Sequence, residues 1–164
     1  MILYGRAALA LGYPHPLPAF AATYDVDAIL PSLEMHKIEA DHQFWDALEL
    51  TNHELTASGL YITHLFTDDQ VILSPDWHGN IVPIPCPGLH LLQPFRPSTL
   101  DLILTKMMRI DPQDREDIEF LLTELDAPIA SVKSVLCNAV IPDVPEIIEA
   151  FQFNKEWLLS RFQK

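Results

Sequence analysis

The order of apolar and polar positions divides the first thirty residues into short elements. The opening MILYG, residues 1–5, predicts a strand that ends at a glycine, and RAALALG, residues 6–12, predicts a short helix. Three prolines within residues 13–20 predict an extended loop. Residues 23–30 then carry Val, Ala, Ile and Leu in a run that is typical of a buried or half-buried strand.

The middle of the chain predicts one helix followed by several strands. Between residues 39 and 58, Phe44, Leu48 and Leu55 recur at roughly helical spacing, and Gly59 provides a C-terminal stop. Apolar runs separated by turn residues then predict short strands at 61–66, 71–74, 80–84 and 89–95.

Helices dominate the second half of the pattern. Ser98 or Thr99 caps a first helix, and Asp111 with Pro112 begins a second one. A weaker helix is expected over 129–139, and a last one runs from about 144 to 162 with a broad apolar stripe. We therefore expect an α+β fold. An α/β core with a small mixed sheet spans 1–97, and a helical segment over 98–164 packs with it as a single compact unit.

Composition and charge narrow the classes of function. The 164 residues include 10 Lys and Arg against 23 Asp and Glu, a net charge of −13, which disfavours broad nucleic-acid binding. No apolar run approaches the roughly 20 residues that span a bilayer, and the N-terminal residues lack a basic leader with a long apolar block. We therefore expect a cytoplasmic protein with reduced thiols and no membrane segment.

Asp25 and Asp27 are the first candidates for chemistry. Side chains two apart share one face of a strand, so both carboxylates are expected to point the same way. Like charges that close repel each other unless something neutralises them. One interpretation is a strand end whose acids face solvent; the other is a pair of ligands for Mg²⁺ that arrives with the phosphates of a nucleotide.

A second candidate cluster lies in the helical half. Lys106 and Arg109 are three residues apart on one expected helix, and Asp114 and Asp117 are three apart on the next. These four residues fit a set of salt bridges that solvates the surface. The alternative is that the lysine contacts a triphosphate.

Taken in order, the two clusters carry a family resemblance. The segments YGRAALALG, TYDVDAIL and LDLILTKMMRIDPQDREDIEFLL resemble the polymerase-β-like nucleotidyltransferase superfamily. The closer likeness is to small bacterial nucleotidyltransferase-like proteins allied to abortive-infection and toxin–antitoxin systems. In this family a glycine pair ends the first strand, and an Arg-x-Thr-x-Asp-x-Asp segment supplies metal-binding carboxylates. A helical Lys and an Arg-Asp-x-x-Asp-like segment then line the nucleotide side.

The resemblance assigns roles to residues of this chain. It implies a metal site at Asp25 and Asp27 for Mg²⁺ or Mn²⁺, with an NTP as substrate. The residues implied on the nucleotide side are Gly5, Arg6, Thr23, Lys106, Arg109, Asp114 and Asp117. Two positions depart from the family pattern, because Arg6 replaces a small residue and Ala21 replaces the arginine. The expected third carboxylate also has no counterpart on the strands at 61–66 and 80–84.

Two functions follow as expectations. The first is a metal-dependent nucleotidyltransferase that transfers a nucleotidyl group from an NTP. The alternative is a catalytically degenerate module that keeps the fold and acts, in the manner of an antitoxin, through a protein partner. The apolar stripe of the last helix (Ile147, Ile148, Phe151, Phe153, Trp157, Leu158, Leu159 and Phe162) either completes the core or forms a homodimer.

Overall fold

The chain forms two compact units that are not continuous in sequence. The computed structural model describes residues 1–23, 25–89 and 92–162. The N-terminal unit consists of Met1–Asp68 and Pro83–Arg96, and the C-terminal unit of Asp69–Val82 and Pro97–Lys164. The sequence placed a single boundary after residue 97. The structure divides the chain after residue 96 and also groups residues 69–82 with the C-terminal helices.

A five-stranded mixed sheet with strand order β3-β2-β1-β5-β4 organises the N-terminal unit. Its central strand β1 (Ile2–Tyr4) pairs antiparallel with β2 (Asp25–Leu30) and parallel with β5 (Phe95–Arg96). Strand β3 (Tyr61–Thr67) pairs parallel with β2, and the short β4 (Val82–Pro83) lies at the other edge. The small mixed sheet with flanking helices is therefore the α+β arrangement that the sequence predicts.

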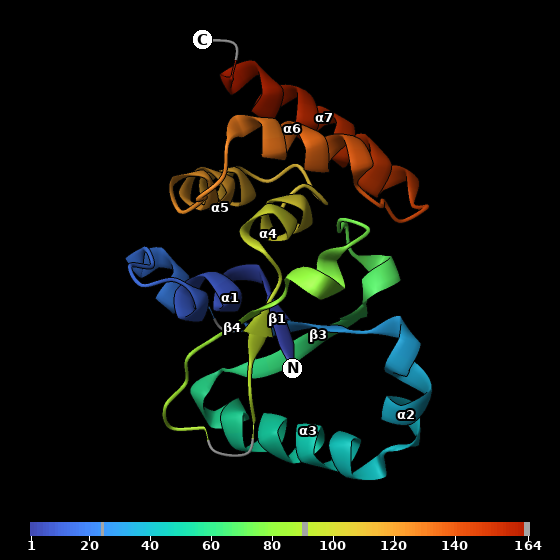
Figure 1. Ribbon diagram of the computed structural model, residues 1–164. Coiled ribbons are helices and arrows are strands. Elements are labelled where there is room, and N and C mark those ends of the chain that lie inside the picture. Colours follow the sequence, from blue (N-terminus) through green and yellow to red (C-terminus); the bar gives the residue numbers. More distant parts are fainter. Residues whose placement is uncertain (24, 90–91, 163–164) are drawn as a thin grey trace. The chain divides into compact units, whose positions relative to one another are not determined.

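Helix α1 (Gly5–Gly12) packs on this sheet against β1, β2 and β5 (Figure 1). Its Leu9 and the strand residues Leu3, Ala28 and Ile29 are at most 3% exposed, so they form the core of the unit. A 3-10 turn η1 (Pro18–Ala22) follows α1 and buries Phe20, where the sequence predicted only an extended loop.

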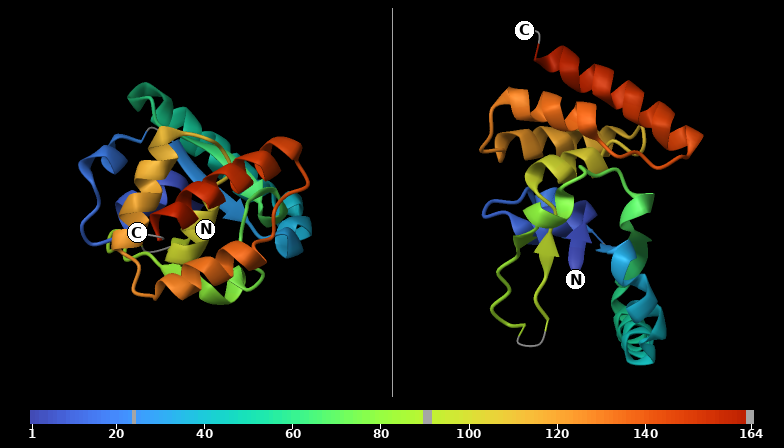
Figure 2. Two further views of the ribbon diagram at one scale, coloured as in Figure 1. Left: turned by 90° about the horizontal axis from the view of Figure 1, so that it is seen from above. Right: turned by 45° about the vertical axis from the view of Figure 1, so that its right-hand side comes forward.

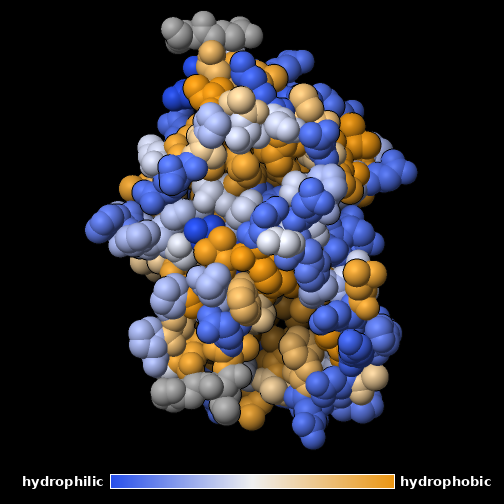
Figure 3. Space-filling view, viewed as in Figure 1, coloured by the Kyte–Doolittle hydropathy of each residue, from blue (hydrophilic) through white to orange (hydrophobic). Residues whose placement is uncertain are grey.

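Two helices follow β2 without entering this core. A 3-10 turn η2 (Ser32–Glu34) leads into α2 (Met35–Ala40), which the sequence did not predict. Helix α3 (His42–Leu55) continues as the turn η3 (Thr56–Ser58) and runs beside β3 (Figure 1). Neither α2 nor α3 has a buried residue, and Figure 3 shows apolar surface exposed in this part of the unit.

The C-terminal unit begins with residues that the sequence assigned to a strand. Residues 71–74 instead form an irregular segment between the 3-10 turns η4 (Asp68–Gln70) and η5 (Trp77–Asn80), with one bridge from Leu73 to Val140. Val71, Ile72 and Leu73 are at most 2% exposed. The apolar run indicates burial correctly but not strand pairing, because periodicity alone does not separate the two. Residues 90 and 91 of the strand expected over 89–95 lie outside the described part.

Four helices complete the C-terminal unit: α4 (Thr99–Thr105), α5 (Pro112–Thr123), α6 (Ile129–Asn138) and α7 (Pro145–Arg161). Ser98 accepts a hydrogen bond from the Asp101 backbone, and Asp111 accepts one from Gln113, so both predicted caps are present. Figure 2 shows α7 lying across α5 and α6. Among the described residues, no helix combines the length and the apolar character needed to span a membrane.

Candidate functional site

The turn between β1 and α1 brings the backbone of Gly5 against a carboxylate of β2. Gly5 has a φ of 66°, a conformation that glycine adopts without a steric penalty. A Cβ atom at this position would lie 2.6 Å from Oδ2 of Asp27. The absence of a side chain at residue 5 therefore allows the Asp27 carboxylate to lie directly on the turn.

Asp25 and Asp27 both lie in β2 and are partly exposed to solvent. Asp27 pairs with Tyr4 of β1, and the β1–β2 register is regular over its three pairs, so the alternation of side chains places both acids on one face. The register with β3 shifts between Val26 and Ala28, and the extra residue belongs to β3. The irregularity thus lies at Asp27, and bulges of this kind interrupt the ladder locally and increase the twist of the strand.

Thr23 holds the first of the two acids. Its hydroxyl donates to Oδ1 of Asp25 at 2.9 Å and also lies 3.3 Å from the Asp25 backbone oxygen. A carboxylate that accepts one such bond keeps its second oxygen in a defined direction. The Thr23 side chain is thus bonded to the first acid of the pair.

Arg6 is the first residue after the Gly5 turn. Its guanidinium lies 5.6 Å from the centre of the Phe20 ring, within the range of a cation–π contact. The sequence of the N-terminal unit contains only three Lys or Arg residues, namely Arg6, Lys37 and Arg96. Arg6 directly follows Gly5, the glycine that lies against Asp27. Of these three cations it is therefore the one attached to the turn beside the acid pair.

Arg96 binds the C-terminal end of α1. Its Nε donates to the backbone oxygen of Gly12 at 3.1 Å, and its guanidinium lies 4.3 Å from the centre of the Tyr13 ring. Burial lowers the pKa of this guanidinium from its usual value, and the neighbouring Tyr13 opposes that shift. An arginine remains charged under such a shift, so Arg96 fixes the last carbonyl of the helix as a cation.

The other predicted residues belong to the C-terminal unit and form a closed ion cluster. Lys106 Nζ lies 2.6 Å from Asp117 Oδ2 and 3.2 Å from Asp114 Oδ1. The Lys106 side chain is 7% exposed, and those of Asp114 and Asp117 are 4% and 0% exposed. Arg109 Nε also donates to Asp114. The structure thus brings these four residues together. Lys106, Asp114 and Asp117 form buried salt bridges, and Arg109, whose side chain is 65% exposed, joins them from the surface. The sequence indicated a solvated surface set or a phosphate contact.

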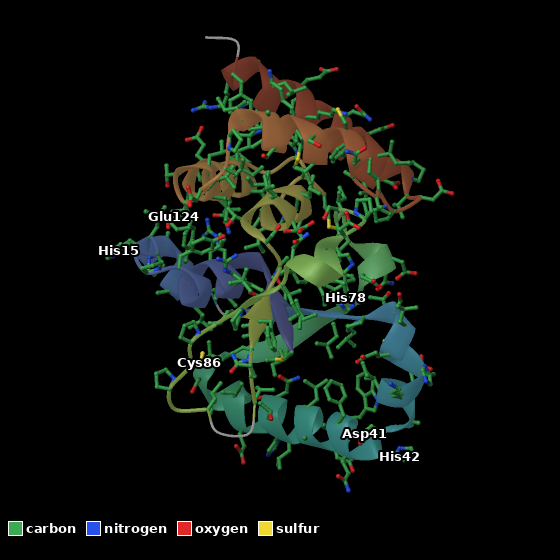
Figure 4. All side chains as sticks on the ribbon, viewed as in Figure 1. His15, Asp41, His42, His78, Cys86 and Glu124 are labelled. Carbon is green, nitrogen blue, oxygen red and sulfur yellow. The ribbon has the colours of Figure 1, made fainter. Side chains whose placement is uncertain are left out.

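The donor set at Asp25 and Asp27 suits a hard divalent cation. Two carboxylates leave most positions of a Mg²⁺ octahedron to phosphate oxygens and waters, which is the usual arrangement for this ion. Within the described residues, no group of three His, Cys, Asp or Glu side chains is arranged to hold a metal. Figure 4 shows His15, His42 and Cys86 on separate elements of the N-terminal unit. The acid pair therefore fits a metal that arrives with a ligand better than a metal held by the protein alone.

One surface of the C-terminal unit was not predicted from the sequence. Ser131, Ser134 and Asn138 line a groove of the C-terminal unit. Their spacing of three and four residues on one helix was the available signal.

Comparisons with protein-family models, with curated proteins and with solved structures find no match to this chain. The evidence on the function of this chain is therefore the geometry of its own residues.

Proposed function

We propose that the N-terminal unit has a nucleotidyltransferase fold and binds an NTP with a divalent metal ion at Asp25 and Asp27. The observation that carries the proposal is the Gly5 turn, in which a backbone without a side chain lies against the Asp27 carboxylate. A phosphate group needs such a backbone in order to approach closely, and a metal-binding carboxylate beside it provides the counterpart for the metal that accompanies the phosphate.

The residues of this chain have distinct tasks in the proposed transfer. Asp25 and Asp27 hold Mg²⁺ or Mn²⁺, and the Thr23 hydroxyl orients Asp25. A metal held there would offset the charge of the phosphate oxygens. In the transfer, an acceptor oxygen bonds to the α-phosphorus of the NTP, and the bond from that phosphorus to pyrophosphate breaks, so that pyrophosphate leaves. Arg6 supplies a positive charge next to the turn.

Calorimetry with Mn²⁺ and ATP, and with each of the other three NTPs, tests this proposal. We expect wild-type protein to bind the metal–NTP pair and Asp25→Asn to bind it at least tenfold more weakly, because a carboxylate ligand is lost. Asp46→Asn is the matched control, since Asp46 is an exposed residue of α3 in the same unit. Equal binding by wild type and Asp25→Asn would contradict the proposal.

The same titration assigns a role to Arg6. A bulky side chain after the glycine either obstructs the phosphate or contacts it, and the scarcity of cations in the N-terminal unit favours a contact. We therefore expect Arg6→Ser to weaken NTP binding about tenfold. Stronger binding by Arg6→Ser would mean that the arginine obstructs the site, and unchanged binding would place the phosphates elsewhere.

A second candidate function is a non-catalytic module that acts through a protein partner, in the manner of an antitoxin. The observation that favours it is the state of Lys106, because the implied phosphate contact is held by two buried carboxylates. The net charge of −13 also suits a basic protein partner better than an unaccompanied polyphosphate. A folded protein that binds no NTP in the calorimetry would support this candidate.

A further inference from the structure

A groove of about 680 Å³, lined by polar and apolar residues, lies within the C-terminal unit. Three segments line it: the turn region 74–80, the start of α4 with its cap, and one face of α6. Leu73, just before the first segment, forms a bridge with Val140, two residues after the end of α6, and α4 contacts α6. The groove is thus built by elements that pack together in one unit, with α4 and α6 labelled in Figure 1.

The α6 wall presents hydrogen-bond acceptors. The Asn138 side-chain amide donates one N–H to the Ser134 backbone oxygen at 3.0 Å, so its Oδ1 acceptor remains together with a second N–H. Ser131 and Ser134 add two hydroxyls on the same face. A hydroxyl accepts as readily as it donates, so this wall is able to receive several donors from one ligand.

The opposite wall has the same polarity. The Asn80 side-chain amide donates one N–H to the Asp76 backbone oxygen at 3.1 Å, so its Oδ1 acceptor and its second N–H both remain. Asp76 is exposed and adds a carboxylate to this wall. The wall therefore combines an amide oxygen with a negative charge.

The buried acid at the base of the groove has a different role. Asp101 is 1% exposed. One of its oxygens accepts from the Ser74 backbone at 2.8 Å, and the other accepts from the Ser98 hydroxyl at 2.6 Å. Asp101 thus fastens residue 74 to the start of α4, and Asp76 is the carboxylate accessible to a ligand.

Acceptors outnumber fixed donors in this groove, and none of its lining residues is Lys, Arg or His. An anion would meet carboxylates without a compensating cation, whereas an ammonium group carries three donors and the opposite charge. We propose that the groove binds a small organic cation that bears ammonium groups, with Asp76 as the charged contact and the serine and asparagine oxygens as neutral acceptors.

Three probes with the same four-carbon chain test the proposal: putrescine, 1,4-butanediol and succinate. Backbone amide resonances of the ¹⁵N-labelled full chain are followed at about 0.15 M salt, which screens unspecific attraction to an acidic surface. We expect putrescine to shift the resonances of 74–80 and 131–138 in a saturable manner. Butanediol should bind much more weakly, and succinate should leave these resonances unchanged.

Two matched variants locate the charged contact. Asp76→Asn should weaken putrescine binding about fivefold. Asp143→Asn should leave it unchanged, because Asp143 is an exposed residue of the same unit outside the groove lining. Shifts spread evenly over acidic surface residues, equal effects of the two variants, or equal binding of succinate would each overturn the proposal. Saturable shifts by Mg²⁺ alone, without putrescine binding, would also overturn it by indicating a metal site.

Discussion

Two glycines of the N-terminal unit share a backbone conformation but not an environment. Gly5 has a φ of 66° and Gly59 a φ of 67°. A Cβ at Gly5 would meet Asp27, whereas a Cβ at Gly59 would have nothing within 4 Å. The comparison of the two positions therefore separates the cost of a left-handed backbone from the cost of contact with the acid pair.

We predict that Gly5→Ala destabilises the protein more than Gly59→Ala. Both variants carry the strain of a side chain at positive φ, about 1 kcal/mol. Gly5→Ala adds an overlap with the Asp27 carboxylate, which costs roughly 1 to 3 kcal/mol more. Urea denaturation of both variants measures the difference in the free energy of unfolding.

A double variant shows whether Asp27 is the cause. With alanine at residue 27, the nearest remaining side-chain atom would lie 3.6 Å from the new Cβ, an ordinary contact. The extra cost of Gly5→Ala should therefore disappear in the background of Asp27→Ala. Additive effects of the two substitutions would place the cost of Gly5→Ala outside the Asp27 contact.

At the scale of elements, the ion cluster joins α5 to the end of α4. Lys106 follows α4 directly, and Asp114 and Asp117 lie in α5. Removal of one partner from a buried ion pair leaves an uncompensated charge, which is far more costly than the loss of a surface pair. The contact that the family resemblance assigned to phosphate is thus a structural link between two helices.

We predict that Lys106→Met lowers the free energy of unfolding by roughly 3 to 5 kcal/mol. The exposed Lys133 of α6 provides the control, because Lys133→Met should change stability by less than about 0.5 kcal/mol. Thermal and urea denaturation measure both variants. A stable Lys106→Met protein that has lost only NTP affinity would contradict the structural role.

The sequence predicts the elements whose signals are local. Ser98, Asp111 and Pro112 mark helix starts that the structure contains, because capping involves only neighbouring residues. The strand prediction for the apolar run at 71–74 is wrong, since these residues join the unit of the C-terminal helices and form only one bridge, from Leu73 to Val140. The buried salt bridges of Lys106 with two aspartates were likewise not predictable, because spacing along a helix does not show whether an ion pair is buried or exposed to solvent.

At the scale of the whole molecule, α7 raises the question of self-association. Phe151 and Leu158 of its stripe are 2% and 0% exposed, so they belong to the core of the C-terminal unit. Val144 and Ile148, at 40% and 37% exposed, are four residues apart at the start of α7 and provide the apolar surface for the proposed homodimer. Removal of the whole helix would destroy the core, so single substitutions are the appropriate test.

We predict that the protein sediments as a homodimer at micromolar concentration. The Ile148→Glu variant should be monomeric, because its new charge would be buried in the α7 interface. Ile129→Glu is the control, since Ile129 is 51% exposed on α6. Sedimentation velocity distinguishes the species. Wild-type protein that sediments as a monomer would exclude the dimer.

The interleaving of the two units has a consequence for synthesis on the ribosome. Strand β5, which pairs with β1, is supplied by residues 95–96, so the first sheet stays incomplete until more than half of the chain has emerged. The buried residues 71–73 emerge earlier still, yet their own unit is completed only by α4 to α7. The apolar surfaces of the first sheet and of residues 71–73 therefore stay uncovered until later residues emerge. The N-terminal unit is able to close its sheet once residue 96 has emerged, whereas the C-terminal unit completes its core only with α7.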